Sequence, residues 1–150
     1  MNDNVHRLLT DFGKYLGLES LALDENGHCS LTFDETCVHI EAMDESSFVL
    51  LHSSLGEIPE NAGREIYMRL LDANYFFQHT AGATLGLEAD TGLVVMSHVV
   101  DMQDMELSSW EAVVQAFVDA AESCARLCNT QAGSAPSVSR PASSDHMSFA

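Results

Sequence analysis

Residues 70–96 contain the pattern that most restricts the fold of this chain, because they combine a helix, two strands and a tight turn. The helical part carries apolar side chains three and four residues apart and ends in three aromatic residues. Residues 83–88 then alternate apolar with small or polar side chains, and the turn at 89–92 leads into a strand at 93–100 that is apolar on both faces. A helix followed by a hairpin predicts helices packed on an antiparallel sheet.

Helical spacing predicts two further helices and the start of the one just described. Residues 4–16 form an amphipathic pattern with the apolar stripe Val5, Leu8, Leu9, Phe12 and Leu16. Residues 106–127 repeat apolar positions at steps of three and four, namely Leu107, Trp110, Val114, Phe117, Ala121, Cys124 and Cys128. Asn61 is predicted to cap the middle helix, which is predicted to run to about residue 77. Asn74, at the edge of its apolar face, is expected to bond the backbone at the junction with the next strand.

Three strand patterns lie between the first two helices. Residues 29–33 and 37–42 alternate apolar with polar side chains, and the two residues Asp34-Glu35 are short enough to join them as a hairpin. Residues 48–51 are apolar on both sides, which is typical of a central strand. The order helix, strands, helix, two strands, helix predicts an α+β sandwich with a mainly antiparallel sheet.

Length and composition predict one domain followed by a tail. Residues 1–128 have the size and apolar content of a single globular domain. Residues 129–150 are rich in Ser, Ala, Pro and Gly, and we predict a disordered polar tail there. The chain has no apolar run that approaches the roughly 20 residues of a membrane helix, and its start has no signal-peptide pattern. We therefore expect no membrane insertion and a cytoplasmic location.

The charge of the chain argues against nucleic acid as a partner. Twenty-three acidic and only six basic side chains give a formal net charge of -17, and no Lys or Arg occurs between Lys14 and Arg64. Binding to phosphates needs clustered basic groups, so DNA and RNA would be repelled. The acidity serves either solubility or attraction of a basic partner segment, and both interpretations stay open.

Catalytic patterns are weak throughout the sequence. The four cysteines include no CxxC pair and behave as small apolar residues, and none of the seven histidines falls in a metal or hydrolase motif. His28, His39, His52 and His98 alternate within the strand patterns, where a hydrogen-bonded or exposed histidine is the ordinary case. We predict no catalytic residues, no metal and no cofactor. A small thiol- or metal-dependent enzyme is kept as the alternative of another class.

The strands at 48–51 and 93–100 carry more apolar surface than one small domain covers by itself. Such an excess predicts self-association or the binding of another chain.

Three short stretches carry a resemblance to a known family. Residues 70–74 (LLDAN), 82–87 (GATLGL) and 91–95 (TGLVV) resemble the signature of the class I type III secretion chaperones, the Tir chaperone family, and residues 17–21 resemble its opening. The resemblance implies a homodimer in the bacterial cytoplasm that uses no nucleotide. It would bind the amino-terminal segment of a secreted effector in extended form and keep it soluble and competent for secretion. The ATPase of the secretion machine is left open as a further partner.

The same resemblance implies two sets of residues. The dimer interface would contain Leu71, Tyr75, Leu85, Gly86 and Leu87, and effector-binding patches would contain Leu9, Phe12, Leu16, Leu31, Phe33, Val38 and Ile40. Each of these apolar residues has a role in the core as its alternative. Within the family, the alternative function is a regulatory chaperone that sequesters an anti-activator of type III secretion genes.

Overall fold

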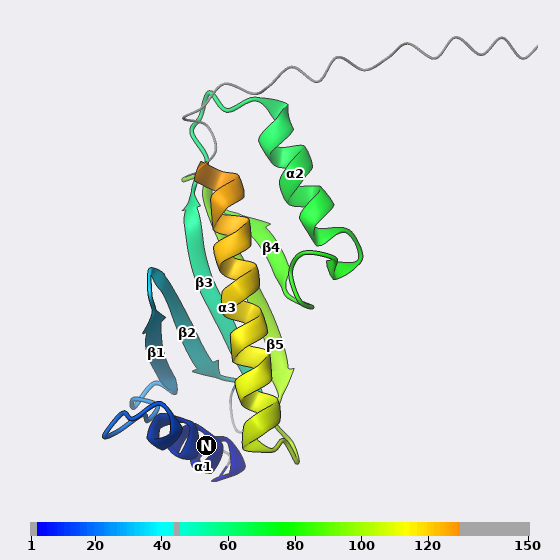
Figure 1. Cartoon of the computed structure of the whole chain (residues 1–150). Coiled ribbons are helices and arrows are strands. Elements are labelled where there is room, and N and C mark those ends of the chain that lie inside the picture. Colours follow the sequence, from blue (N-terminus) through cyan, green and yellow to red (C-terminus); the bar gives the residue numbers. More distant parts are fainter. Residues whose placement is uncertain (1–2, 44–45, 130–150) are drawn as a thin grey trace, which may run out of the picture.

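The computed structural model describes residues 3–43 and 46–129, which form helices on a five-stranded sheet (Figure 1). The helices are α1 (Asp3–Tyr15), α2 (Arg64–Asn74) and α3 (Leu107–Asn129), and a short 3-10 turn, η1 (Tyr75–Phe77), follows α2. The strands are β1 (His28–Phe33), β2 (Thr36–Ala42), β3 (Phe48–Glu57), β4 (Thr84–Leu87) and β5 (Leu93–Asp101). The predicted α+β class is confirmed.

All neighbouring strands are antiparallel and lie in the order β1-β2-β3-β5-β4. The predicted hairpin at Asp34-Glu35 joins β1 to β2, and Asp34 adopts a left-handed φ of 51° there. The chain leaves β3 through α2, enters the sheet again at the edge with β4, and places β5 between β4 and β3. β1 and β4 are therefore the two edges of the sheet.

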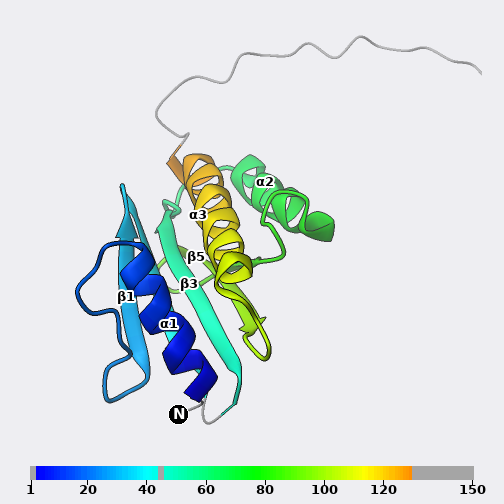
Figure 2. The ribbon, with the colours of Figure 1, turned by 60° about the horizontal axis from the view of Figure 1, so that its bottom comes forward.

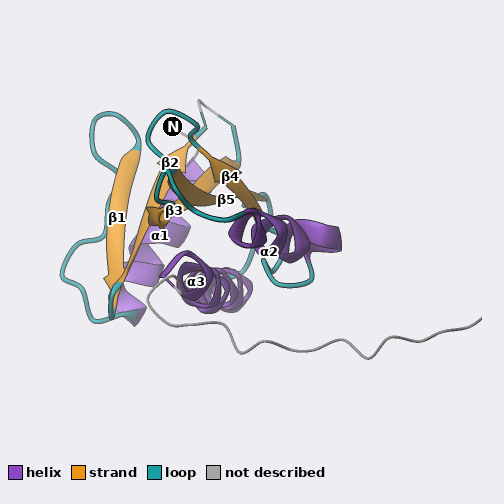
Figure 3. Ribbon diagram, turned by 90° about the horizontal axis from the view of Figure 1, so that it is seen from above, coloured by secondary structure: helices purple, strands orange, loops and turns teal. Residues whose placement is uncertain are grey.

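The helices lie on one side of the sheet (Figures 2 and 3). Alternate residues of the central strands, such as Ile40 and Leu51, are fully buried beneath α1 and α3. Trp110, near the start of α3, is also fully buried and meets the ring of Phe12 edge-on at 6.0 Å between centroids. The alternation of the strands thus assigns one face to the core, while the other face carries the more polar side chains.

The largest differences from the predicted boundaries occur at α2 and at β3. A turn in which the Ala62 amide donates to the Pro59 carbonyl occupies the segment around Asn61, so Gly63 and not Asn61 is the N-cap of α2. The helix ends at Asn74, three residues before the predicted end. β3 continues to Glu57, well beyond the predicted residue 51, because its backbone stays paired with β5 and Ser53 and Leu55 continue the alternation of buried residues; a bulge falls between Ser54 and Gly56.

The predicted role of Asn74 is confirmed. Its side-chain amide donates to the carbonyl of Leu85 at 3.1 Å, and its side-chain oxygen accepts the Leu85 backbone N–H at 2.8 Å. The two bonds fasten the end of α2 to β4. Of the predicted tail, residues 130–150 lie outside the described residues, and Asn129 ends α3.

Candidate functional site

An apolar cavity of about 370 Å³ lies between α1, the end of β1 and the first half of α3. Phe12 and Leu16 come from α1 and its end, Phe33 from β1, and Val114 and Val118 from α3. The remaining lining residues are mostly polar: Tyr15, Ser108, Glu111, Ala112 and Gln115. The cavity combines an apolar wall with a polar rim, which is the usual composition of a site that takes apolar side chains.

A second cavity of about 600 Å³ follows next to it, between the β1–β2 turn, β3 and the second half of α3. Its wall includes the carboxylates of Asp34, Glu35 and Glu122 and one basic side chain, Arg126, above a floor that contains Leu55. The other lining residues are Thr36, Ser53, Ser54, Ala121, Ala125 and Asn129. We call the two cavities together the α3 trough, because both lie along α3 on the side of β1.

The predicted effector-binding residues divide into two groups. Phe12, Leu16 and Phe33 meet at the first cavity. Leu9, Val38 and Ile40 are at most 1% exposed and form part of the core, and Leu31 packs against that core without lining either cavity. Three of the seven residues therefore line this cavity; Leu16 and Phe33 are partly exposed there, whereas Phe12 is 2% exposed and also belongs to the core.

Sequence reasoning did not find the contribution of α3 to this trough. Val118 lies outside the apolar repeat of the third helix. Val114 belongs to that repeat, which predicts burial and does not indicate a cavity. The available signal was Val118 itself, an apolar residue just beside the main stripe.

A second surface lies on α2 and η1, where the predicted dimer residues are located. Leu71 is 69% exposed and Tyr75 59%, and both line a shallow cavity with Met68, Arg69 and Asp72. Phe76 and Phe77, which sequence reasoning did not include, are also exposed, at 77% and 53%. Gly86 and Leu87 are exposed on β4, whereas Leu85 is buried beneath α2 and belongs to the core.

The exposed aromatic pair also sits on an unusual backbone. Phe76 and Phe77 have left-handed φ values of 48° and 57°, a conformation that is rare for large non-glycine residues. Such conformations cost on the order of 1–3 kcal/mol and persist where other interactions hold them. Together with Met68, Leu71 and Tyr75, these residues form what we call the α2 patch, a group of exposed apolar side chains of the kind that marks a binding surface.

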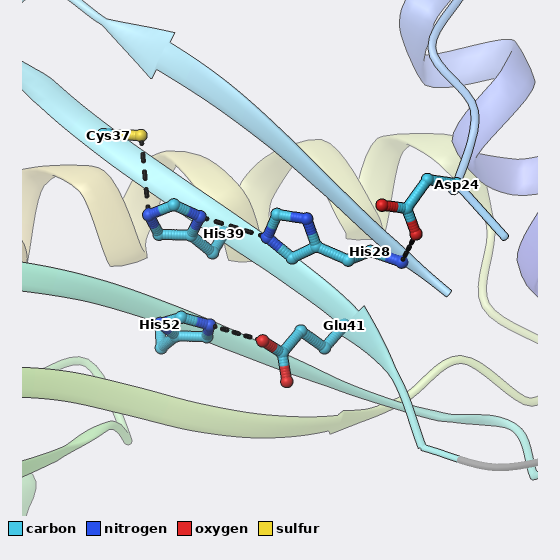
Figure 4. Close-up of polar contacts among 6 residues, drawn as sticks. All are labelled: Asp24, His28, Cys37, His39, Glu41 and His52. Atoms are coloured by element: carbon cyan, nitrogen blue, oxygen red, sulfur yellow. Dashed lines mark hydrogen bonds and ion pairs between the residues drawn. The ribbon is translucent and has the colours of Figure 1, made fainter. Parts of the chain in front are cut away.

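Three histidines stand in a row on the face of the sheet opposite the helices (Figure 4). The rings of His28 and His39 stack at 5.3 Å between centroids, and those of His39 and His52 at 4.8 Å. Glu41 pairs with His52 at 3.0 Å, and the Cys37 thiol lies 3.7 Å from Nε2 of His39. In the described ranges, no group of three His, Cys, Asp or Glu side chains is placed to hold a metal ion.

The thiols of Cys29, Cys124 and Cys128 are buried, and burial lowers the reactivity of a thiol. Burial raises the pKa of Cys29 to about 11 and also raises the pKa of Cys124 and of Cys128. A thiol with a raised pKa stays protonated near neutral pH and is a poor nucleophile. Within the part of the chain that the structure describes, no helix is long and apolar enough to cross a membrane.

The chain is similar in sequence to a protein family and to a characterised bacterial protein. Residues 7–125 match the model of the Tir chaperone protein (CesT) family. The transcriptional anti-antiactivator ExsC of Pseudomonas aeruginosa is 31% identical over 128 residues, which cover 85% of this chain and 87% of ExsC.

Solved structures agree with this match. A chain of the crystal structure of the ExsC–ExsE complex superimposes with a TM-score of 0.69 at 30% identity, covering 85% of this chain and 97% of the other. A chain of the structure of the Yersinia pestis type III secretion chaperone SycH with a fragment of YscM2 has the same fold, with a TM-score of 0.62 at 22% identity, covering 80% and 98%. The resemblance seen in the sequence is confirmed, and this chain belongs to the Tir chaperone protein (CesT) family.

Proposed function

We propose that this protein is a type III secretion chaperone that binds the amino-terminal segment of a secreted effector in extended form, without a cofactor, in the bacterial cytoplasm. The observation that carries the proposal is the α3 trough, whose first cavity lies between the edge strand β1 and the helices α1 and α3. Membership of the family supplies the class of partner.

The geometry of the trough suits an extended segment. β1 is an edge strand, so a partner strand can add to it through main-chain hydrogen bonds. Side chains of that strand that point toward the helices reach the cavity lined by Phe12, Leu16 and Phe33. Each Leu- or Phe-sized side chain fully buried there contributes about 1.5–3 kcal/mol.

The same proposal includes a homodimer that forms through the α2 patch. Leu71, Tyr75 and Phe76 expose apolar surface on one side of the domain, while the trough lies on the other side of α3. A two-fold contact would bury the same patch of both copies and leave both troughs accessible.

Calorimetric titration tests the binding of the effector. The ligand is the amino-terminal segment of a secreted protein encoded next to the gene of this chain. Leu16→Ser and Phe33→Ser should each weaken binding about tenfold or more, because each removes apolar contact from the first cavity. Val99→Ser is the matched control, since Val99 is 51% exposed on the opposite face of the sheet.

Circular dichroism on each variant separates a lost contact from a lost fold. Folded Leu16→Ser and Phe33→Ser variants that bind as tightly as the parent would contradict the trough as the binding site. Absence of binding by the parent to every neighbouring secreted protein would contradict the function.

A regulatory chaperone that sequesters an anti-activator is the second candidate. The specific observation in its favour is the similarity to ExsC, a transcriptional anti-antiactivator, which extends over 85% of this chain. Deletion of the gene separates the two functions. Loss of one secreted protein with unchanged transcription of the secretion genes supports the effector chaperone, and a general fall in that transcription supports the regulator.

A further inference from the structure

The histidine row joins the β1–β2 hairpin to the rest of the sheet. His28 begins β1, His39 lies in the middle of β2, and His52 lies in β3 directly opposite His39. Nε2 of His28 and Nδ1 of His39 are 3.1 Å apart, a hydrogen-bonding distance. The three stacked rings therefore connect three strands on the face of the sheet that the helices leave open (Figure 4).

The hydrogen bond between His28 and His39 depends on the protonation of both rings. One nitrogen must donate and the other accept, so at least one of the two facing nitrogens must carry no proton. If both rings are protonated, two N–H groups face each other and the bond is lost. Two positive rings would then also repel each other across a short distance.

The charged groups around the row compensate only in part for a positive charge on His39. Glu41, on β2, is already bonded to His52, and Asp24, before β1, accepts the backbone N–H groups of Asn26 and His28. The remaining ring nitrogen of His39 faces the Cys37 thiol.

No titratable side chain of β4 or β5 stands opposite the row. Across β3, the position next to His52 is Ser97 of β5, and next to that is Thr84 of β4. The helices, with their charged residues, lie on the other face. Among residues 3–43 and 46–129, the groups that bear on the charge of His39 are therefore those on β1, β2, β3 and the segment before β1.

We propose that the row of His28, His39 and His52 is a proton-sensitive latch, which helps to hold β1 to β2 and β2 to β3 near neutral pH and weakens both attachments in mildly acidic solution. The latch depends on the uncharged ring of His39 at the centre of the row. It acts on the folded chain itself and does not require the proposed partner.

The direction of the pH effect follows from linkage. Partial burial, with smaller contributions from His52 and His28, lowers the pKa of His39 below its usual value of 6.5, and Glu41 opposes this only in part. The folded state then binds fewer protons than the unfolded state, so stability is complete above pH 6.5 and falls as the pH decreases through that value. Hydrogen bonds lower the pKa values of Asp24 and Asp101 from the usual 3.8. The stability that these two carboxylates contribute is therefore lost only in a more acidic range than that of His39.

Urea unfolding of the full chain at pH 7.5 and pH 5.5, at one protein concentration, tests the latch. The parent should show a several-fold larger unfolding equilibrium constant at pH 5.5. His39→Gln, which is neutral at both values, should lose most of this pH difference. His6→Gln, an exposed histidine on α1, should keep it.

A second variant and a local measurement complete the design. His28→Gln removes the outer member of the bonded pair and should also reduce the pH difference, so the test stands even if His39→Gln does not fold. Amide exchange, corrected for its intrinsic pH dependence, should show that the β1–β2 and β2–β3 ladders lose more protection at pH 5.5 than the β3–β5 ladder does. A parent without a pH difference, folded His28 and His39 variants that retain it in full, or equal loss of protection in all ladders would each overturn the proposal.

Discussion

The family resemblance assigns both Leu71 and Leu85 to the dimer interface, but the two side chains differ in their exposure in the single chain. Leu71 is 69% exposed on α2, and Leu85 is 8% exposed on β4, held beneath α2 by the Asn74 side chain. A substitution at Leu71 therefore tests association, whereas the same substitution at Leu85 tests folding.

Leu71→Asp should convert the proposed dimer into a folded monomer. A carboxylate in the centre of an apolar contact loses its hydration without a partner, which costs several kcal/mol. Light scattering at micromolar concentration should give half the mass of the parent, with an unchanged circular dichroism spectrum. Met43→Asp, at a 41% exposed position on another side of the domain, should leave the mass unchanged. A dimeric Leu71→Asp protein, or a monomeric parent, would contradict the α2 patch as the interface.

Periodicity in the sequence separates the two faces of a strand, but not the accessible from the inaccessible positions on the inner face. Ile40 and Phe33 follow the same alternating pattern, yet Ile40 lies in β2 under the helices and Phe33 lies at the end of an edge strand beside a cavity. That difference depends on strand order and on the position of α1, which are tertiary properties. Three of the seven predicted binding residues line the trough for this reason, and the sequence could not distinguish them from the others.

At the scale of elements, the join between α2 and β4 depends on one side chain. Asn74→Ala removes both bonds to Leu85 and leaves a buried strand backbone without these partners. The expected loss is about 1–3 kcal/mol for unsatisfied groups of this kind. On the usual scaling, the melting temperature should fall by roughly 3–10 °C, which differential scanning calorimetry measures.

Asn4→Ala is a useful comparison for that experiment. The Asn4 side chain donates to the Met102 carbonyl at 2.7 Å and so bonds a different pair of elements. Its loss should reduce stability without changing the α2 patch. An Asn74→Ala protein as stable as the parent would show that the aromatic turn after α2 holds the junction without these bonds.

The predicted helices and strands agree with the structure where the apolar pattern is long, and differ from it where local backbone geometry determines the end of an element. The helices at 4–16 and 106–127 follow the apolar repeat closely, because burial of one stripe dictates where a helix must continue. The end of α2 did not follow this rule, since Phe76 and Phe77 turn into a left-handed conformation that no propensity favours. The length of β3 was underestimated because the polar residues His52, Ser53 and Ser54 end the apolar run, although their backbone remains paired with β5.

For the whole molecule, the formal net charge of -17 and the apolar trough suggest two different sources of partner affinity. Acidic groups such as Asp34, Glu35 and Glu122 stand at the second cavity, where they attract basic side chains. Exposed charge pairs contribute little at physiological salt, because water and ions screen them. Burial of apolar side chains in the first cavity is not screened in this way.

The complex with the effector segment should therefore tolerate salt better than it tolerates the loss of apolar contact. Raising sodium chloride from 0.1 to 0.5 M should weaken binding by less than about fivefold, the range expected for exposed charge pairs. Phe33→Ser in 0.1 M salt should weaken it more, and Asp34→Asn with Glu35→Gln should remove only the salt-dependent part. The measurement is calorimetric titration at each salt concentration. If salt abolishes the complex while the folded Phe33→Ser protein binds like the parent, the acidic cavity is the principal recognition element and the apolar cavity is secondary.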